Sequence, residues 1–159
     1  MTRGVLLDMA RHFGEEMLAE GTVWNRAEIE AAASAQGVEI REGDVVLFHT
    51  GWLALAGSDP ARFMAAEPGL GLEGARYLAT KGVVAIGADT WALEVIPFER
   101  EDQVFPVHPE LLAKHGVYIL ENMDTRALAK DRAHEFLFVL GQPRFRGAVQ
   151  AIINPVAIR

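Results

Sequence analysis

The sequence contains no cysteine among its 159 residues. This absence excludes a disulfide framework, a catalytic thiolate and a zinc site built from cysteine. No apolar run approaches the roughly 18 residues of a membrane-spanning helix, and the apolar stretch near residue 5 is too short for the core of a signal peptide. These absences predict a soluble cytoplasmic protein with no membrane contact.

Positive charge is scarce and is not clustered. The chain has 15 lysines and arginines against 22 aspartates and glutamates, which gives a formal net charge of −7. That balance argues against nucleic acid or an anionic membrane surface as partner, and it is compatible with attraction of a cation. Half of the residues are hydrophobic, and the length suits one domain with its own core, so we expect a single domain over residues 1–159.

Apolar runs bounded by turn residues predict buried strands, and the periodic segments between them predict helices. Strands are expected at 5–7, 45–48, 83–86, 117–120, 136–140 and 151–153, and helices at 26–36, 72–81, 109–115 and 124–130, with one helical turn at 61–65. Asn25 with Glu28 forms a capping box, while Pro109 and Gly116 bracket a short helix. Residues 91–107 are expected to form a long exposed loop, and the fold class is α/β.

Polar side chains follow the expected strands at their carboxyl ends. His49, Asp89 and Glu121 come after three of these strands, and His108 opens the helix before the last of them. If the strands are parallel, these residues share one edge of the sheet, where α/β proteins bind ligands. Imidazole and carboxylate suit Zn²⁺ or Mn²⁺, so His108 and Glu121 are candidate metal ligands. Alternatively, His108 only caps its helix and Glu121 is only solvated.

Several segments together resemble a known family. The region from His108 to Glu121 and Asn122 has a histidine, a helix and a strand that ends in Glu-Asn. Further similar segments are 3–8, 43–47, 50–52, 68–70, 87–90, 135–139 and 146–148. In this order they resemble the C-terminal half of the metal-dependent cyclase family, also called kynurenine formamidase-like hydrolases. The resemblance covers nearly the whole chain.

The resemblance implies the swivelling β/β/α fold of that family and hydrolysis of amide or lactam C–N bonds, as in kynurenine formamidase (arylformamidase). It implies a divalent metal, Zn or Mn, held in part by His108 and Glu121. It also implies a small-molecule amide or lactam as substrate, and a homo-oligomer. Exposed apolar surface is a further reason to expect self-association.

Four residues are candidates for substrate binding. Asp89 and Thr90 match a family motif near the active site, although Asp89 could instead satisfy backbone donors in the turn after its strand. Trp52 and Trp91 follow strand ends and could line an apolar pocket, or could belong to the core. We assign no role to His49.

The sequence also departs from the family. The upstream His-x-Gly-Thr-His-x-Asp pattern, which provides most metal ligands, and the catalytic histidine that follows it are absent, so no catalytic residue is named. After Ala148 the chain continues with Val149 where members often have Thr-Gly-Ser-Pro. We therefore expect a cyclase-like domain that is incomplete at its N-terminus. The alternative is a truncated, non-catalytic domain that acts as a binding or assembly module.

Overall fold

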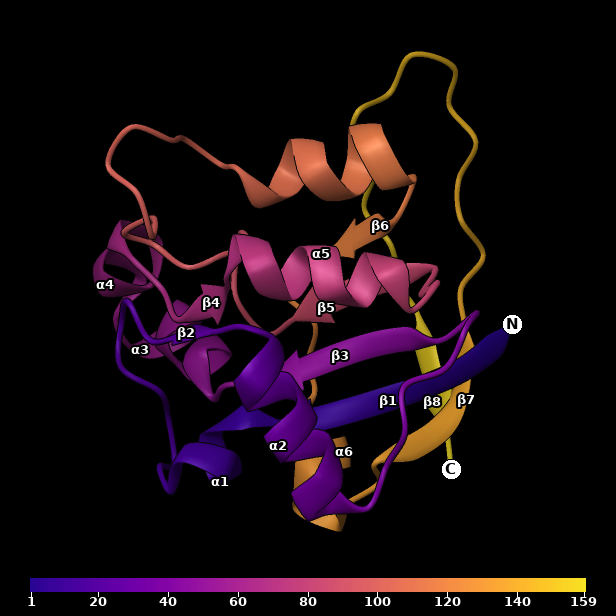
Figure 1. The fold of residues 1–159 in the computed structure, drawn as a ribbon, viewed down its shortest axis with the longest axis horizontal. Helices are drawn as coiled ribbons and strands as arrows, with labels where there is room; N and C mark the ends of the chain where they lie inside the picture. Colours follow the sequence, from indigo (N-terminus) through magenta and orange to yellow (C-terminus); the bar gives the residue numbers. More distant parts are fainter.

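A six-stranded sheet runs through the computed structural model, which describes all of residues 1–159 (Figure 1). The strand order is β6-β5-β3-β1-β7-β8. Four strands are parallel, namely β1 (Thr2–Asp8), β3 (Val45–His49), β5 (Ala85–Ala88) and β6 (Tyr118–Leu120). Antiparallel pairing adds β7 (Glu135–Val139) and β8 (Val156–Ile158), and a separate two-stranded sheet pairs β2 (Val23–Trp24) with β4 (Gly69–Leu70). The predicted α/β class is confirmed.

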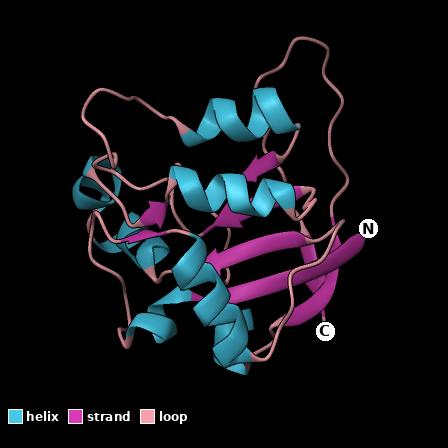
Figure 2. Ribbon diagram, in the orientation of Figure 1, coloured by secondary structure: helices cyan, strands magenta, loops and turns pink.

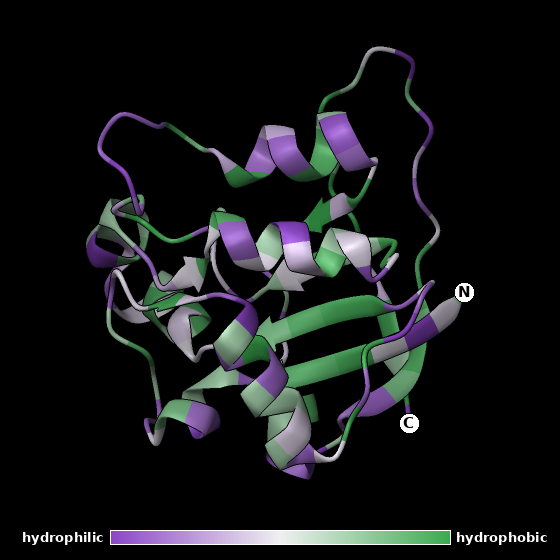
Figure 3. Cartoon of the chain, in the orientation of Figure 1, coloured by the Kyte–Doolittle hydropathy of each residue, from purple (hydrophilic) through white to green (hydrophobic).

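Helices cover one face of the parallel strands. Three crossovers return the chain over this face, namely α2 (Arg26–Gln36), α5 (Leu72–Thr80) and the π-helical η2 (Pro109–His115) (Figure 2). Side chains alternate along β3, so Val46 and Phe48 face these helices, whereas Val45 and Leu47 face α6 (Arg126–Asp131). Because both faces are buried there, the runs 5–7 of β1 and 45–48 of β3 are continuously hydrophobic (Figure 3).

Two helix predictions match the structure closely. At the start of α2, the Asn25 backbone N–H donates to Glu28 Oε2 at 2.8 Å, and Gly37 ends the helix with φ 70°. Pro109 is the first residue of η2, and Gly116 follows its last turn with φ 67°. Glycine adopts this left-handed conformation at little cost, which explains why both helices stop there.

Other boundaries differ from the prediction. β5 begins two residues later than expected, because Ala85 is the first residue that pairs with Val45. The strand expected at 151–153 is wrong; β8 forms at Val156–Ile158, where the chain pairs with β7. The helical turn at 61–65 lies within α4 (Pro60–Ala65), while α1 (Met9–Phe13), η1 (Trp52–Ala54), α3 (Leu55–Ser58), β2 and β4 were not predicted. None of the helices combines the length and hydrophobicity that crossing a bilayer requires.

The segment 91–107 has neither helix nor strand, as expected, but its first part is not exposed. Ala92, Leu93, Glu94 and Val95 are all buried. Backbone hydrogen bonds hold this part against β4, from Leu70 N to Leu93 O at 2.9 Å and from Val95 N to Leu70 O at 3.3 Å. The prediction of an exposed loop is therefore wrong for this part.

The close approach of β4 to this segment depends on Gly69. A Cβ atom added at Gly69 would lie 2.2 Å from the backbone carbon of Glu94 and 2.2 Å from the backbone nitrogen of Val95. Both contacts are with backbone, which cannot move aside as a flexible side chain can. We expect Gly69→Ala to lower the free energy of unfolding by about 2 kcal/mol in urea titrations.

Gly57→Ala is the matched control, because a Cβ atom at Gly57 in α3 meets nothing within 4 Å. We expect that variant to stay within about 0.5 kcal/mol of the wild type. Equal destabilisation in the two variants would contradict this account of Gly69.

Candidate metal centre

The polar residues singled out in the sequence gather at the edge where the parallel strands end. β3 ends with His49, and β5 and β6 are followed directly by Asp89 and Glu121. Successive side chains of a strand point to opposite faces of the sheet, so these residues do not all lie on the same face. Glu121 lies on the face covered by η2, whereas His49 and Asp89 lie on the face covered by α6. The edge therefore carries two distinct clusters.

The first cluster contains His108 and Glu121. His108 Nε2 lies 3.4 Å from Glu121 Oε1, and the two side chains are 25% and 27% exposed. The structure thus brings the two predicted ligands together with part of each accessible. Their role as metal ligands stays a prediction.

Behind His108 lies Glu94, which the sequence analysis missed. Its carboxylate accepts the His108 ring Nδ1–H at 2.5 Å, the His108 backbone N–H at 3.2 Å and the Val107 backbone N–H at 3.2 Å. The hydrogen bond and charge of Glu121, followed by those of Glu94, raise the pKa of His108 to about 9, although partial burial opposes this rise. The only sequence signal for Glu94 is its place between apolar residues, Leu93 and Val95.

A second buried glutamate, Glu67, was also missed. Its carboxylate accepts the backbone N–H groups of Trp91 at 2.7 Å and of Ala92 at 3.0 Å. Burial raises the pKa of Glu67 to about 8, although these two donors lower it, and the charge of Glu121 adds to the rise. Glu67 and Glu94 each bind two consecutive backbone N–H groups, so together they fasten both ends of the segment 91–107.

Of the four predicted substrate-binding residues, Trp91 is connected to His108 by aromatic contacts. The Trp91 ring packs edge-on against Phe105 at 6.2 Å, and Phe105 packs against the His108 ring at 5.3 Å. Trp52 and Thr90 are completely buried, and Trp52 Nε1 donates to Phe63 O at 3.3 Å. These positions favour the core interpretation for Trp52.

Asp89 belongs to the second cluster. Its carboxylate accepts hydrogen bonds from the Thr50 backbone N–H and hydroxyl at 2.8 and 2.7 Å, and from the Gly51 backbone N–H at 2.9 Å. His49 Nδ1 lies 3.3 Å from Asp89 Oδ2 and 2.8 Å from Thr125 Oγ1. These contacts favour the alternative in which Asp89 satisfies backbone donors of a turn, although the turn is the one after β3 and not the one after its own strand, β5. A substrate role for Asp89 or Thr90 stays a prediction.

The charge around His49 makes stability depend on pH. Although burial lowers it, the hydrogen bond and charge of Asp89, with the nearby carboxylates of Asp8 and Asp124, raise the pKa of His49 above its ordinary value. A pKa that is higher in the folded state means that protonated His49 stabilises the fold below about pH 6.5. This contribution is lost as the pH rises through the folded-state pKa.

We therefore expect the free energy of unfolding to fall more steeply above pH 6.5 in the wild type than in His49→Gln, as measured by urea unfolding at several pH values. His12→Gln is the control, because His12 is not among the histidines that form ion pairs. A His49→Gln profile parallel to that of the wild type would refute the linkage.

The donor atoms of His108 and Glu121 fit a divalent cation. Two ligands of a tetrahedral zinc ion, each at about 2.1 Å, lie roughly 3.4 Å apart, and the Nε2–Oε1 separation is 3.4 Å. No group of three or more histidine, aspartate or glutamate side chains has metal-ligand geometry. This chain therefore offers two candidate ligands, and a complete coordination shell would require others.

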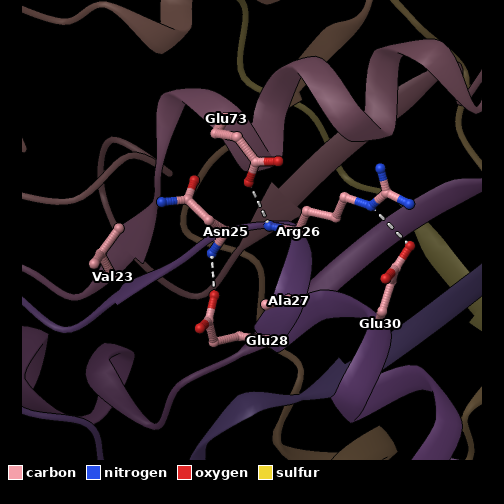
Figure 4. Close-up of a pocket in the computed structure, with 7 residues that line it drawn as sticks. All are labelled: Val23, Asn25, Arg26, Ala27, Glu28, Glu30 and Glu73. Carbon is pink, nitrogen blue, oxygen red and sulfur yellow. Dashed lines mark hydrogen bonds and ion pairs between the residues drawn. The ribbon is translucent and has the colours of Figure 1, made fainter.

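An open pocket at the start of α2 does not include any of these residues. It is lined by polar groups that bind one another, since Glu28 accepts from Asn25 N at 2.8 Å and Glu73 accepts from Arg26 N at 2.7 Å (Figure 4). Its polar groups are thus largely satisfied within the chain.

Comparison with known proteins decides the family. Residues 1–95, more than half of the chain, match the family model described as putative cyclase. The chain belongs to this family. The resemblance read from the sequence is therefore confirmed, and none of the curated proteins matches the chain.

Solved structures of cyclase-family proteins share the fold. A novel cyclase is 30% identical, with a TM-score of 0.86 over 99% of this chain and 53% of its own. An isatin hydrolase bound to the product analogue thioisatinate is 20% identical, with a TM-score of 0.79 over 98% of this chain and 59% of its own. A predicted metal-dependent hydrolase from Bacillus stearothermophilus is 22% identical, with a TM-score of 0.58 over 88% of this chain and 55% of its own. The cyclase-like fold is confirmed, and the chain spans little more than half the length of these structures.

Proposed function

We propose that this cyclase-family protein is a metal-dependent hydrolase of amide or lactam C–N bonds, similar to kynurenine formamidase, that uses Zn²⁺ or Mn²⁺. The single observation that carries the proposal is the His108–Glu121 pair, with its imidazole held by buried Glu94, at the carboxyl edge of a parallel sheet. Family membership supports it. So do the names of two proteins with this fold, a predicted metal-dependent hydrolase and an isatin hydrolase, since isatin is a cyclic amide.

In this proposal each residue has a separate task. His108 Nε2 and Glu121 Oε1 hold the cation, and Glu94 holds the imidazole. When bound, a divalent cation supplies Lewis acidity, which lowers the pKa of water toward 7 and polarises a carbonyl group. The overall reaction would add water across the C–N bond, with the hydroxyl going to the carbonyl carbon and the proton to the leaving nitrogen. Trp91 and Phe105 border His108 and are the candidate substrate wall.

The second candidate function is a non-catalytic binding or assembly module. It is favoured by one observation, namely that no third ligand joins His108 and Glu121. In the hydrolase proposal, the further ligands come from an additional polypeptide segment or from a second copy of the chain. The two candidates therefore differ in whether this pair binds metal at all.

We expect Zn²⁺ or Mn²⁺ to bind the wild-type chain in calorimetric titrations, with affinity reduced at least tenfold in His108→Ala and in Glu121→Ala, because each variant loses one of two ligands. His115→Ala is the control, since His115 lies at the end of η2, where its ion-pair partner is Glu110. Hydrolysis of an aryl formamide and of isatin would then be assayed with the same variants. Wild-type affinity in both ligand variants would refute the metal site and favour the binding module.

Self-association forms part of the same proposal. The segment 141–155 extends from the body between β7 and β8 as a long loop (Figure 1). Its apolar residues Phe145, Val149 and Ile152 are 70%, 93% and 100% exposed. The outer edge of β8 is also unpaired. Exposed apolar side chains beside an open strand edge are typical of an interface, and a second copy of the chain is the expected partner.

We expect the wild type to sediment as a dimer or larger species at micromolar concentration. The double variant Val149→Asp with Ile152→Asp is expected to sediment as a monomer, because charge in the contact opposes burial. Met64→Asp is the control, since Met64 is an exposed apolar residue on α4. A monomeric wild type would contradict this part of the proposal.

A further inference from the structure

We infer that Glu94 is a positioning residue, which holds the Nδ1–H of the His108 ring so that Nε2 is the nitrogen that faces Glu121 and is the one to give up its proton when a cation binds. The inference rests on the proposed function, because it assigns Glu94 the task of preparing a ligand for the cation. It does not make Glu94 a ligand, since its carboxylate is buried and bound on the far side of the ring from Glu121.

Glu94 holds both the backbone and the ring of His108. Oε1 accepts the backbone N–H at 3.2 Å and the ring Nδ1–H at 2.5 Å, while Oε2 accepts Val107 N–H at 3.2 Å. A carboxylate can accept at both oxygens and donates at neither, so this arrangement requires Nδ1 to be the donor. A neutral imidazole protonated at Nδ1 has its lone pair on Nε2, the atom that faces Glu121.

The residues that flank and contact Glu94 fix its backbone conformation. Leu93 has φ 65°, an uncommon conformation for a bulky residue, and its side chain is completely buried in the core. On the other side, the absence of a Cβ atom at Gly69 lets β4 contact the Glu94 backbone. Strained backbone persists only where its surroundings hold it, and here the held conformation directs Glu94 toward His108.

Glu67 shows which part of this arrangement is specific to His108. Like Glu94, it is fully buried and accepts two consecutive backbone N–H groups. Unlike Glu94, it makes no hydrogen bond to an imidazole. Fastening the segment 91–107 is therefore a property that the two glutamates share, whereas setting the His108 tautomer belongs to Glu94.

A carboxylate behind a metal-ligating histidine has a known physical effect. It fixes the tautomer and the ring orientation, and it raises the basicity of the coordinating nitrogen. Loss of such a partner lowers metal affinity about 10- to 100-fold. We therefore expect the zinc dissociation constant of Glu94→Gln to rise by that factor, with Glu67→Gln closer to the wild type.

The decisive experiment is the ¹⁵N imidazole NMR spectrum of the metal-free protein, assigned with His108→Ala and recorded well above pH 9, because the pKa of His108 is about 9 and the ring is neutral only there. We expect the Nδ1–H tautomer in the wild type and in Glu67→Gln. In Glu94→Ala we expect a shift toward the Nε2–H tautomer, because Nδ1 loses its acceptor while Nε2–H can still donate to Glu121.

Either of two results would overturn the inference. One is an Nε2–H tautomer in the wild type, a result that does not depend on the folding of any variant. The other is an unchanged Nδ1–H tautomer in folded Glu94→Ala. Because the spectrum is recorded without metal, it separates this inference from the proposed function. The expected tautomers in a chain that binds no zinc would leave Glu94 as the group that orients His108 and would refute only the metal proposal.

Discussion

Parallel pairing of β1, β3, β5 and β6 is the constraint on which the site depends. It requires the chain to cross back over the sheet after each strand, which places α2, α5 and η2 on one face and brings the carboxyl ends of all four strands to one edge. His49 and Asp89, which are widely separated along the chain, become neighbours only through this arrangement. Without it, none of their hydrogen bonds could form.

Side-chain alternation then divides that edge into two environments. On the α6 face, every oxygen of Asp89 has a protein donor and His49 is bound to Asp89 and Thr125, so the cluster joins strand ends to α6. On the η2 face, His108 Nε2 and Glu121 remain partly exposed. The first cluster therefore suits a structural role, and the second has the open donor atoms that a ligand requires.

The accessible pair is supported by two buried glutamates. Glu67 and Glu94 lie behind it and compensate the cost of their burial with hydrogen bonds from backbone N–H groups. They fasten a segment that has no secondary structure of its own, and the Glu94 carboxylate places negative charge against the His108 ring. A chain that spans little more than half the length of its solved relatives can thus contain a well-ordered part of a site.

The sequence by itself determined features that depend on local physics. Capping residues and glycines set the bounds of α2 and η2, apolar runs located β1, β3 and β6, and the Glu-Asn motif with its preceding histidine identified the family and the candidate ligands. Tertiary structure alone decided the rest. Pairing partners, not periodicity, set the start of β5 and the position of β8. Glu67 and Glu94 were missed because a buried carboxylate and a solvated one look alike in sequence, and only folding brings their backbone donors to them.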